Sequence, residues 1–162
     1  MDGLKFLLAA ATIVDGLLAG ASLDQSVEQL PARHRIGVRA YHAYTQASHM
    51  ANGRFWLIPL GIVGPILRVA ASFWVYRLGL AEDAVLSVGM AAVLAVGHLL
   101  LTLRAGSINW ALTPWQPPER QIKDELELAK IFQSFERWQA VRASVQLLTF
   151  VAGVWALVAV MQ

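Results

Sequence analysis

The sequence predicts an all-α integral membrane protein, a four-helix bundle forming one membrane domain over residues 1–162. Of its residues, 57% are hydrophobic and only 15% are charged, whereas soluble domains average about 25% charged residues. The mean hydropathy is +0.52. Four apolar stretches are long enough to cross about 30 Å of hydrocarbon at about 1.5 Å of helical rise per residue. The rest of the chain is too short for a second folded domain.

The first predicted span covers residues 4–23 and contains one carboxylate, Asp15. A cleaved signal peptide is the alternative interpretation, with Lys5 as its charged region and residues 19–21 as its cleavage site. Asp15 argues against it because an acid interrupts the apolar run. A bare charge at this depth costs at least about 2.5 to 3.5 kcal/mol, so Asp15 needs a partner, a proton or water.

The polar stretch 24–53 predicts an amphipathic interfacial helix, with Pro31 in its first turn and Gly53 at its end. Three polar residues directly after the first span either solvate its end or form the lip of a pocket entrance. They are Asp24, Gln25 and Glu28.

The second and third predicted spans, 55–80 and 85–103, each contain a basic side chain. Arg68 lies in the middle of the second span, and His98 lies in the third. The polar turn at 79–84 is so short that these two spans must run antiparallel.

Residues 104–118 contain glycine, asparagine and prolines and predict a loop. From Pro118 the pattern predicts one long helix that extends into the cytoplasm and ends in the fourth span, 143–161.

The distribution of Lys and Arg predicts the orientation. Ten of them lie in the first and third connections, whereas only Lys5 and Arg77 lie on the opposite side. By the positive-inside rule both long connections are cytoplasmic and both termini are extracytoplasmic, which we expect in a bacterial inner membrane.

Composition also excludes several function classes. Without cysteine, disulfides, thiolate metal sites and cysteine nucleophiles are absent. The basic residues form no stripe, which argues against nucleic acid as a partner. His42 and His49 are seven residues apart, about 10.5 Å along a helix, too far for one metal ion unless a third ligand lies between them. We therefore predict no metal site.

Counting residues from the span ends places Asp15, Arg68 and His98 about 14, 20 and 11 Å from the inner surface. We expect these side chains to face one another inside the bundle. In a functional site Arg68 would bind an oxyanion or phenolate, and Asp15 or His98 would be the catalytic residue that moves a proton. Alternatively, the Asp–Arg pair only holds two helices together, and His98 bonds to a carbonyl or hydroxyl.

Several short motifs resemble the anthrone oxygenase-like family of small four-span membrane proteins. The most telling is a Trp and an Arg entering the last span, although Gln139 stands where that family commonly has Asn. The motifs are residues 16–22 (GLLAGAS), residues 29–32 (QLPA), Asn109 with Leu112, and Trp138 with Arg142.

This resemblance implies a four-helix membrane bundle that oxygenates an electron-rich planar phenol without metal, flavin or another cofactor. By this analogy Asn109, Trp138 and Arg142 bind substrate, or they cap and anchor the long helix.

Three functions follow as hypotheses: an oxygenase-like protein that binds a planar aromatic molecule or quinol, a non-enzymatic accessory subunit of a larger membrane complex or homo-oligomer, and a small transporter. A deep pocket at Asp15, Arg68 and His98 would favour the first. Tight packing there, with an exposed small-residue stripe at Gly89, Ala92 and Val96, would favour the second.

Overall fold

The protein is described by a computed structural model, which covers residues 1–110, 112, 122 and 124–162. Within these residues every regular element is a helix, which confirms the all-α prediction. The elements are α1 (Asp2–Asp24), the π-helical turn η1 (Gln25–Gln29), α2 (Leu30–Ile36), α3 (Val38–Ala47), the π-helical turn η2 (Ser48–Gly53), α4 (Arg54–Leu78), α5 (Glu82–Trp110) and α6 (Glu125–Met161).

Four stretches within the described chain are long and apolar enough to cross a membrane: Asp2–Ile36, Arg54–Leu78, Glu82–Ile108 and Glu125–Met161. They agree with the four predicted spans and indicate an integral membrane protein.

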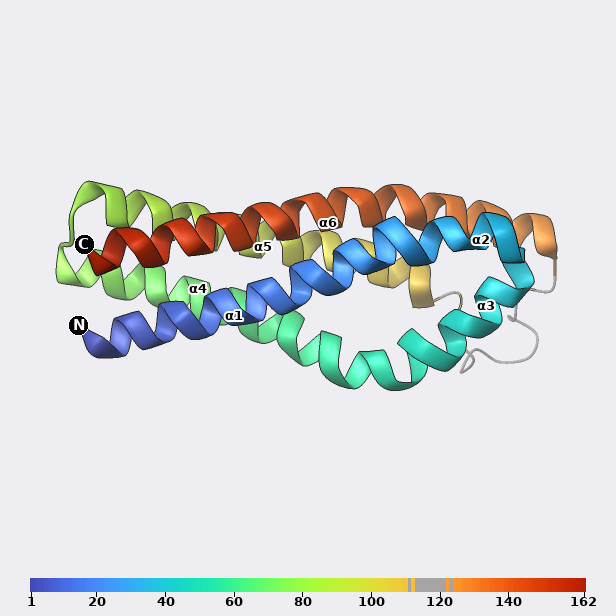
Figure 1. Ribbon diagram of the computed structural model, residues 1–162, viewed down its shortest axis with the longest axis horizontal. Coiled ribbons are helices and arrows are strands. Elements are labelled where there is room, and N and C mark those ends of the chain that lie inside the picture. Colours follow the sequence, from blue (N-terminus) through green and yellow to red (C-terminus); the bar gives the residue numbers. More distant parts are fainter. Residues whose placement is uncertain (111, 113–121, 123) are drawn as a thin grey trace.

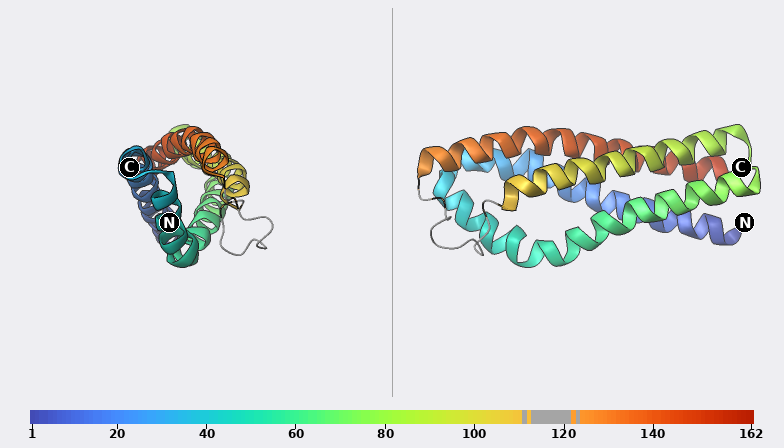
Figure 2. Two further views of the ribbon diagram at one scale, coloured as in Figure 1. Left: turned by 90° about the vertical axis from the view of Figure 1, so that its right-hand side faces the viewer. Right: turned by 180° about the vertical axis from the view of Figure 1, so that it is seen from behind.

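The four long helices form a ring in which each packs against two others. α1 contacts α6 and α4, and α5 likewise contacts α6 and α4. Both termini lie at one end of the bundle, the terminal end, and α2 and α3 lie at the other, the distal end (Figure 1). Figure 2 shows the ring along its length and the same two ends from behind.

Apolar residues pack into two separate clusters. The cluster at the terminal end contains Leu4, Leu8, Ala71, Val75, Ala84, Val88, Ala156 and Val160. The cluster at the distal end contains Leu30, Tyr41, Ala105, Leu112, Leu128, Phe132 and Phe135. The two clusters use opposite ends of α5 and α6, and the stretch of bundle between them contains most of the buried polar side chains.

The interfacial segment differs from the single helix that the sequence predicts. Gly37 has φ of +86°, a conformation that only glycine adopts readily, and it separates α2 from α3. Pro31 lies in the first turn of α2, as predicted. Gly53 does not stop the helix as predicted, because its φ of −57° is helical and α4 follows at once.

The third connection also differs. α5 continues to Trp110, so the predicted loop is wrong for 104–110. The long last helix begins at Glu125 and not at Pro118, because Asp124 has extended backbone and its carboxylate caps the helix by accepting from the Leu126 N–H at 3.1 Å. Most of the residues between Trp110 and Asp124 lie outside the described part of the chain.

Candidate functional site

Between the two apolar clusters, α1 and α6 face each other with polar residues. Along each helical segment these residues lie three, four or seven positions apart, which places them on one side of the helix. We call this set the polar seam: Thr12, Asp15 and Ser22 on α1 with Gln25 at the start of η1, and Gln139, Arg142, Gln146 and Thr149 on α6. All but Arg142 are buried. In a membrane such side chains must satisfy one another, water or a ligand.

Towards the terminal end of the seam, Arg68 reaches from α4 to Asp15. Its Nε and Nη2 lie 2.7 and 2.6 Å from Asp15 Oδ2, and Nη2 also donates to Thr12 Oγ1 at 3.0 Å. Arg68 has no exposed surface, and Asp15 is 5% exposed. The predicted pairing of Asp15 with Arg68 is therefore confirmed.

Glycine lets α6 close over this ion pair. A Cβ at Gly153 would lie 1.9 Å from Arg68 Nη2, and one at Gly64 would lie 3.4 Å from Asp15 Oδ1. The pair is thus packed closely against the backbone of α6 and α4 at these two glycines. This packing favours the interpretation of the pair as a clamp between α1 and α4.

His98 is not part of that clamp. Its Nε2 lies 2.9 Å from Thr102 Oγ1, one turn along α5, and Arg142 is close enough to act on it electrostatically. Because Gly153 contacts Arg68 and Arg142 lies eleven residues away on α6, the two levels are about 16 Å apart along the bundle. The expectation that His98 faces Asp15 and Arg68 is corrected: it bonds to a hydroxyl, as in the alternative interpretation.

Arg142, at the level of His98, forms no ion pair with an acid among the described residues. Its Nη2 donates to Gln25 Oε1 at 3.0 Å, and its Nε is buried without a hydrogen-bond partner in the described structure. The ion pairs among the described residues join Arg33 and His34 to Glu136, Arg39 to Glu125, and Arg68 to Asp15. Arg142 belongs to none of them.

The neighbours of Arg142 are also incompletely satisfied. Gln139 donates from Nε2 to the Ser22 carbonyl at 3.3 Å, but its Oε1 is buried without a partner in the described structure, as is Gln146 Oε1. Trp138 lies one turn away and carries the Arg104 guanidinium 5.7 Å from its ring centre. Three predicted site residues, His98, Trp138 and Arg142, therefore share one half of the bundle. Asn109 lies on α5, and its side chain is outside the described part.

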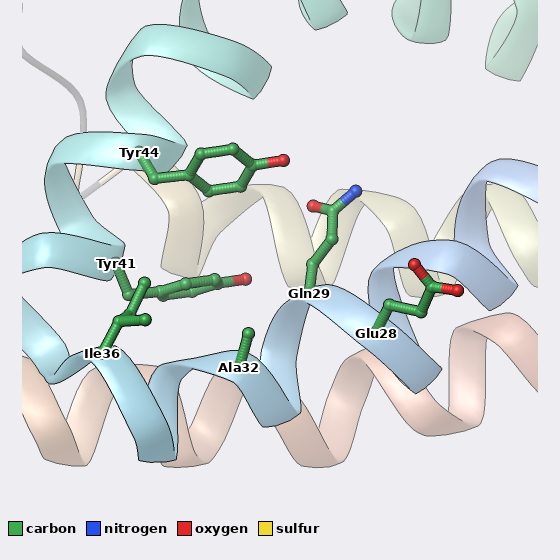
Figure 3. Close-up of a pocket in the computed structure, with 6 residues that line it drawn as sticks. All are labelled: Glu28, Gln29, Ala32, Ile36, Tyr41 and Tyr44. Atoms are coloured by element: carbon green, nitrogen blue, oxygen red, sulfur yellow. The ribbon is translucent and has the colours of Figure 1, made fainter.

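An open groove of about 300 Å³ lies at the distal end, between η1, α2 and α3. Its lining consists of Glu28, Gln29, Ala32, Ile36, Tyr41 and Tyr44 (Figure 3). Glu28 thus lies at a pocket, as one of the two interpretations of the residues after the first span predicts.

Two tyrosines form one wall of this groove. Their ring centres are 6.1 Å apart and their planes are tilted by 35°. The hydroxyls point the same way, towards the side of Gln29 (Figure 3). Tyr41 also packs edge-on against Phe132 at 5.0 Å, which fixes its ring. Its hydroxyl is buried without a partner among the described residues, and burial raises the pKa of Tyr41 to about 12.

The groove and the polar seam are adjacent. Gln25, which accepts from Arg142, and Gln29, which lines the groove, begin and end the π-helical turn η1, so they lie about one turn apart. π-Helical turns frequently occur at functional sites because they re-aim side chains within a helix. The sequence gives no signal for the tyrosines, which lie within the irregular pattern of the interfacial segment.

The predicted small-residue stripe is not uniformly exposed. Ala92 is buried, Gly89 is partly buried and Val96 is exposed.

No family model matches the chain, and no curated protein or solved structure matches it.

Proposed function

We propose that the protein binds a planar aromatic phenol or quinol in the groove between η1, α2 and α3. The observation that carries the proposal is the pairing of an aromatic wall with buried polar atoms that lack partners in the described structure. The rings of Tyr41 and Tyr44 supply the wall, and Tyr41 Oη and Gln29 Oε1 are the polar atoms. A planar phenol would satisfy both kinds of surface at once.

The dimensions suit one small ligand. Small-molecule sites occupy about 300 to 1,000 Å³, so a groove of about 300 Å³ holds a two- or three-ring compound. Its ring would stack against Tyr44, and its hydroxyl would donate to Gln29 Oε1 or accept from Tyr41. The open side would admit an apolar ligand from the membrane boundary.

The chemistry we propose is oxygenation without metal or flavin, as the family resemblance implies. An anthrone methylene would become a carbonyl, with one oxygen atom of O2 entering the product and the other leaving as water. The reaction needs a group that takes the proton and donors that stabilise the resulting oxyanion. His98, which lies on α5 near Arg142 and outside the groove lining, remains our predicted proton acceptor, whereas Asp15 is engaged by Arg68.

We place the protein in a bacterial inner membrane with the distal end cytoplasmic and both termini extracytoplasmic. The support is the concentration of Lys and Arg in the two connections at that end. The groove would then open near the cytoplasmic face.

The test is ligand retention and binding by the whole protein. Native mass spectrometry of the detergent-solubilised protein should show a bound aromatic molecule, and titration with anthrone should give saturable binding. Tyr44→Ala should weaken binding about threefold to tenfold, because an aromatic contact contributes about 0.5 to 1.5 kcal/mol. Tyr76→Ala, at an exposed tyrosine of α4, is the matched control. Equal binding by both variants would exclude the groove as the ring site.

Oxygen consumption with anthrone separates binding from catalysis. The wild type should consume O2 faster than empty lipid particles, and His98→Gln should remove this difference while leaving anthrone binding intact. Binding without oxygen consumption would refute the oxygenase and leave a binding protein.

The second candidate is a non-enzymatic subunit of a larger membrane complex. The closed packing of Gly153 over Arg68 favours it, because that charged pair acts only as a clamp. A stoichiometric protein partner in native mass spectrometry, with no aromatic ligand, would support this candidate.

A further inference from the structure

The two interior arginines of the bundle have different surroundings. Arg68 is neutralised by Asp15 at 2.6 Å. Arg142 has only the neutral Gln25 amide as a hydrogen-bond partner, and its Nε is buried without one in the described structure. A partly buried charge without a counter-charge and with an unpartnered N–H group is costly, and this cost falls when an anion binds.

We infer that Arg142 binds a single oxyanion, a carboxylate or phenolate, inside the bundle between α1, α5 and α6. The guanidinium is held on one side by Gln25, so its Nε and remaining N–H groups have a fixed direction. A monoanion would restore neutrality at this level, as Asp15 does at the level of Arg68.

The groups around Arg142 favour an organic oxyanion over a metal complex or a polyanion. No carboxylate pairs with Arg142 among the described residues, and the other nearby polar groups are the His98 imidazole and side-chain amides. Gln139 and Gln146 flank Arg142 on the same side of α6, one turn away in each direction, and each has a buried amide oxygen without a partner in the described structure. Those oxygens would accept from a hydroxyl or water carried with the anion.

The position also provides access. Arg142 is only partly buried, and its partner Gln25 lies one turn from the groove residue Gln29. The oxyanion could belong to the phenol of the proposed function or to a fatty carboxylate from the bilayer. The inference does not depend on the groove, since either source would place a single oxyanion at the guanidinium.

The test uses the full chain in phosphatidylcholine nanodiscs at pH 8 and compares 4-nitrophenolate with its neutral analogue nitrobenzene. Empty nanodiscs correct for partition into lipid. The wild type should bind the anion about tenfold to hundredfold more tightly than nitrobenzene, as expected for a charge-assisted hydrogen bond in a buried site. Arg142→Gln should abolish this preference, whereas Arg142→Lys should keep part of it. Arg137→Gln, at an exposed arginine of the same helix, should bind like the wild type.

Stability without ligand distinguishes an anion site from a structural role. Because Arg142 is an uncompensated charge, Arg142→Gln should unfold at the same or a higher temperature than the wild type when no anion is present. The anion should raise the unfolding temperature of the wild type and not that of Arg142→Gln. A large loss of stability in ligand-free Arg142→Gln, or equal affinity of the wild type for 4-nitrophenolate and nitrobenzene, would overturn the inference.

Competition identifies the source of the oxyanion. Displacement of 4-nitrophenolate by dodecanoate would support a lipid-derived carboxylate, and displacement only by aromatic phenolates would support the phenol. Two measurements separate this inference from the proposed function. If the wild type does not bind anthrone and Tyr44→Ala still binds 4-nitrophenolate as the wild type does, the groove proposal fails while the oxyanion site stands.

Discussion

The Asp15–Arg68 clamp gives the sharpest prediction, because both charges are buried and joined directly. Arg68 has no exposed surface, and its Nη2 lies 2.6 Å from Asp15 Oδ2. Asp15→Asn or Arg68→Gln alone leaves one buried charge without its counter-charge, which costs about 3 to 5 kcal/mol of unfolding free energy. The double variant leaves two neutral amides and should cost less than the sum of the single variants by about 2 to 3 kcal/mol.

The assay is reversible unfolding in mixed micelles with increasing dodecyl sulfate, followed by far-ultraviolet circular dichroism. Arg77→Gln and Asp83→Asn are the matched controls, since both side chains are exposed and neither belongs to an ion pair among the described residues. Each should change the unfolding free energy by less than about 0.5 kcal/mol. If the double variant is at least as harmful as the sum of the single variants, the direct interaction is wrong.

Three further predictions concern other parts of the bundle. Gly153→Ala should lower the unfolding free energy by about 1 to 3 kcal/mol in the same assay, because the new Cβ meets the buried Arg68 guanidinium. Gly89→Ala is the control and should not lower it, because the space around its Cβ is open. Arg33→Gln should lower the unfolding free energy by about 1.5 to 3 kcal/mol and speed proteolysis of α2, because the 2.7 Å bond from this buried arginine to Glu136 joins α2 to α6. Unchanged proteolysis would show that other contacts hold α2. Folding raises the pKa of Tyr41 from 10.0 to about 12, so the folded state keeps this proton to a higher pH than the unfolded state does. The unfolding free energy should therefore fall by about 2 to 3 kcal/mol as the pH rises from 10 to 12. Tyr41→Phe should not show this fall.

The helices and the clamp could be predicted because both follow from the cost of polarity in lipid. Apolar stretches of about 20 residues are strong signals for spanning helices. A carboxylate inside one of them requires compensation, and Arg68 is the interior cation at a comparable depth. The prediction needed only length, composition and charge.

The position of His98 could not be predicted from span ends. α5 continues seven residues past the predicted end of the third span, about 10 Å, and α1 leads directly into η1. Apolar boundaries therefore do not mark one common plane, and a count from them misplaces side chains by two or three turns. The rotation of each helix, which decides whether His98 faces Asp15 or Arg142, is set by packing among the helices.

The groove depends on a single backbone feature that the sequence only hints at. Gly37 turns the chain so that α3 folds back over η1 and α2, and this brings Tyr41 against Gln29. A continuous interfacial helix, as the amphipathic pattern predicts, would carry the tyrosines away from the end of the first span. Glycine permits the turn, but the contact of Tyr41 with Phe132 of α6 stabilises it.

α6 has glutamines and an arginine on its packed face, and these side chains form the polar seam with α1. Because lipid tails are as apolar as leucine, an apolar seam would have no hydrophobic driving force to hold α1 against α6. Polar side chains can hold the two helices together when each finds a partner. At the level of Arg68 the chain supplies the counter-charge, Asp15, although Arg68 Nη1 is buried without a hydrogen-bond partner in the described structure. At the level of Arg142 it supplies a neutral amide and leaves two glutamine oxygens and one guanidinium N–H without partners in the described structure. The same fold thus contains a completed charge pair and an incomplete one, and the incomplete one is where a ligand from outside the chain has a place to bind.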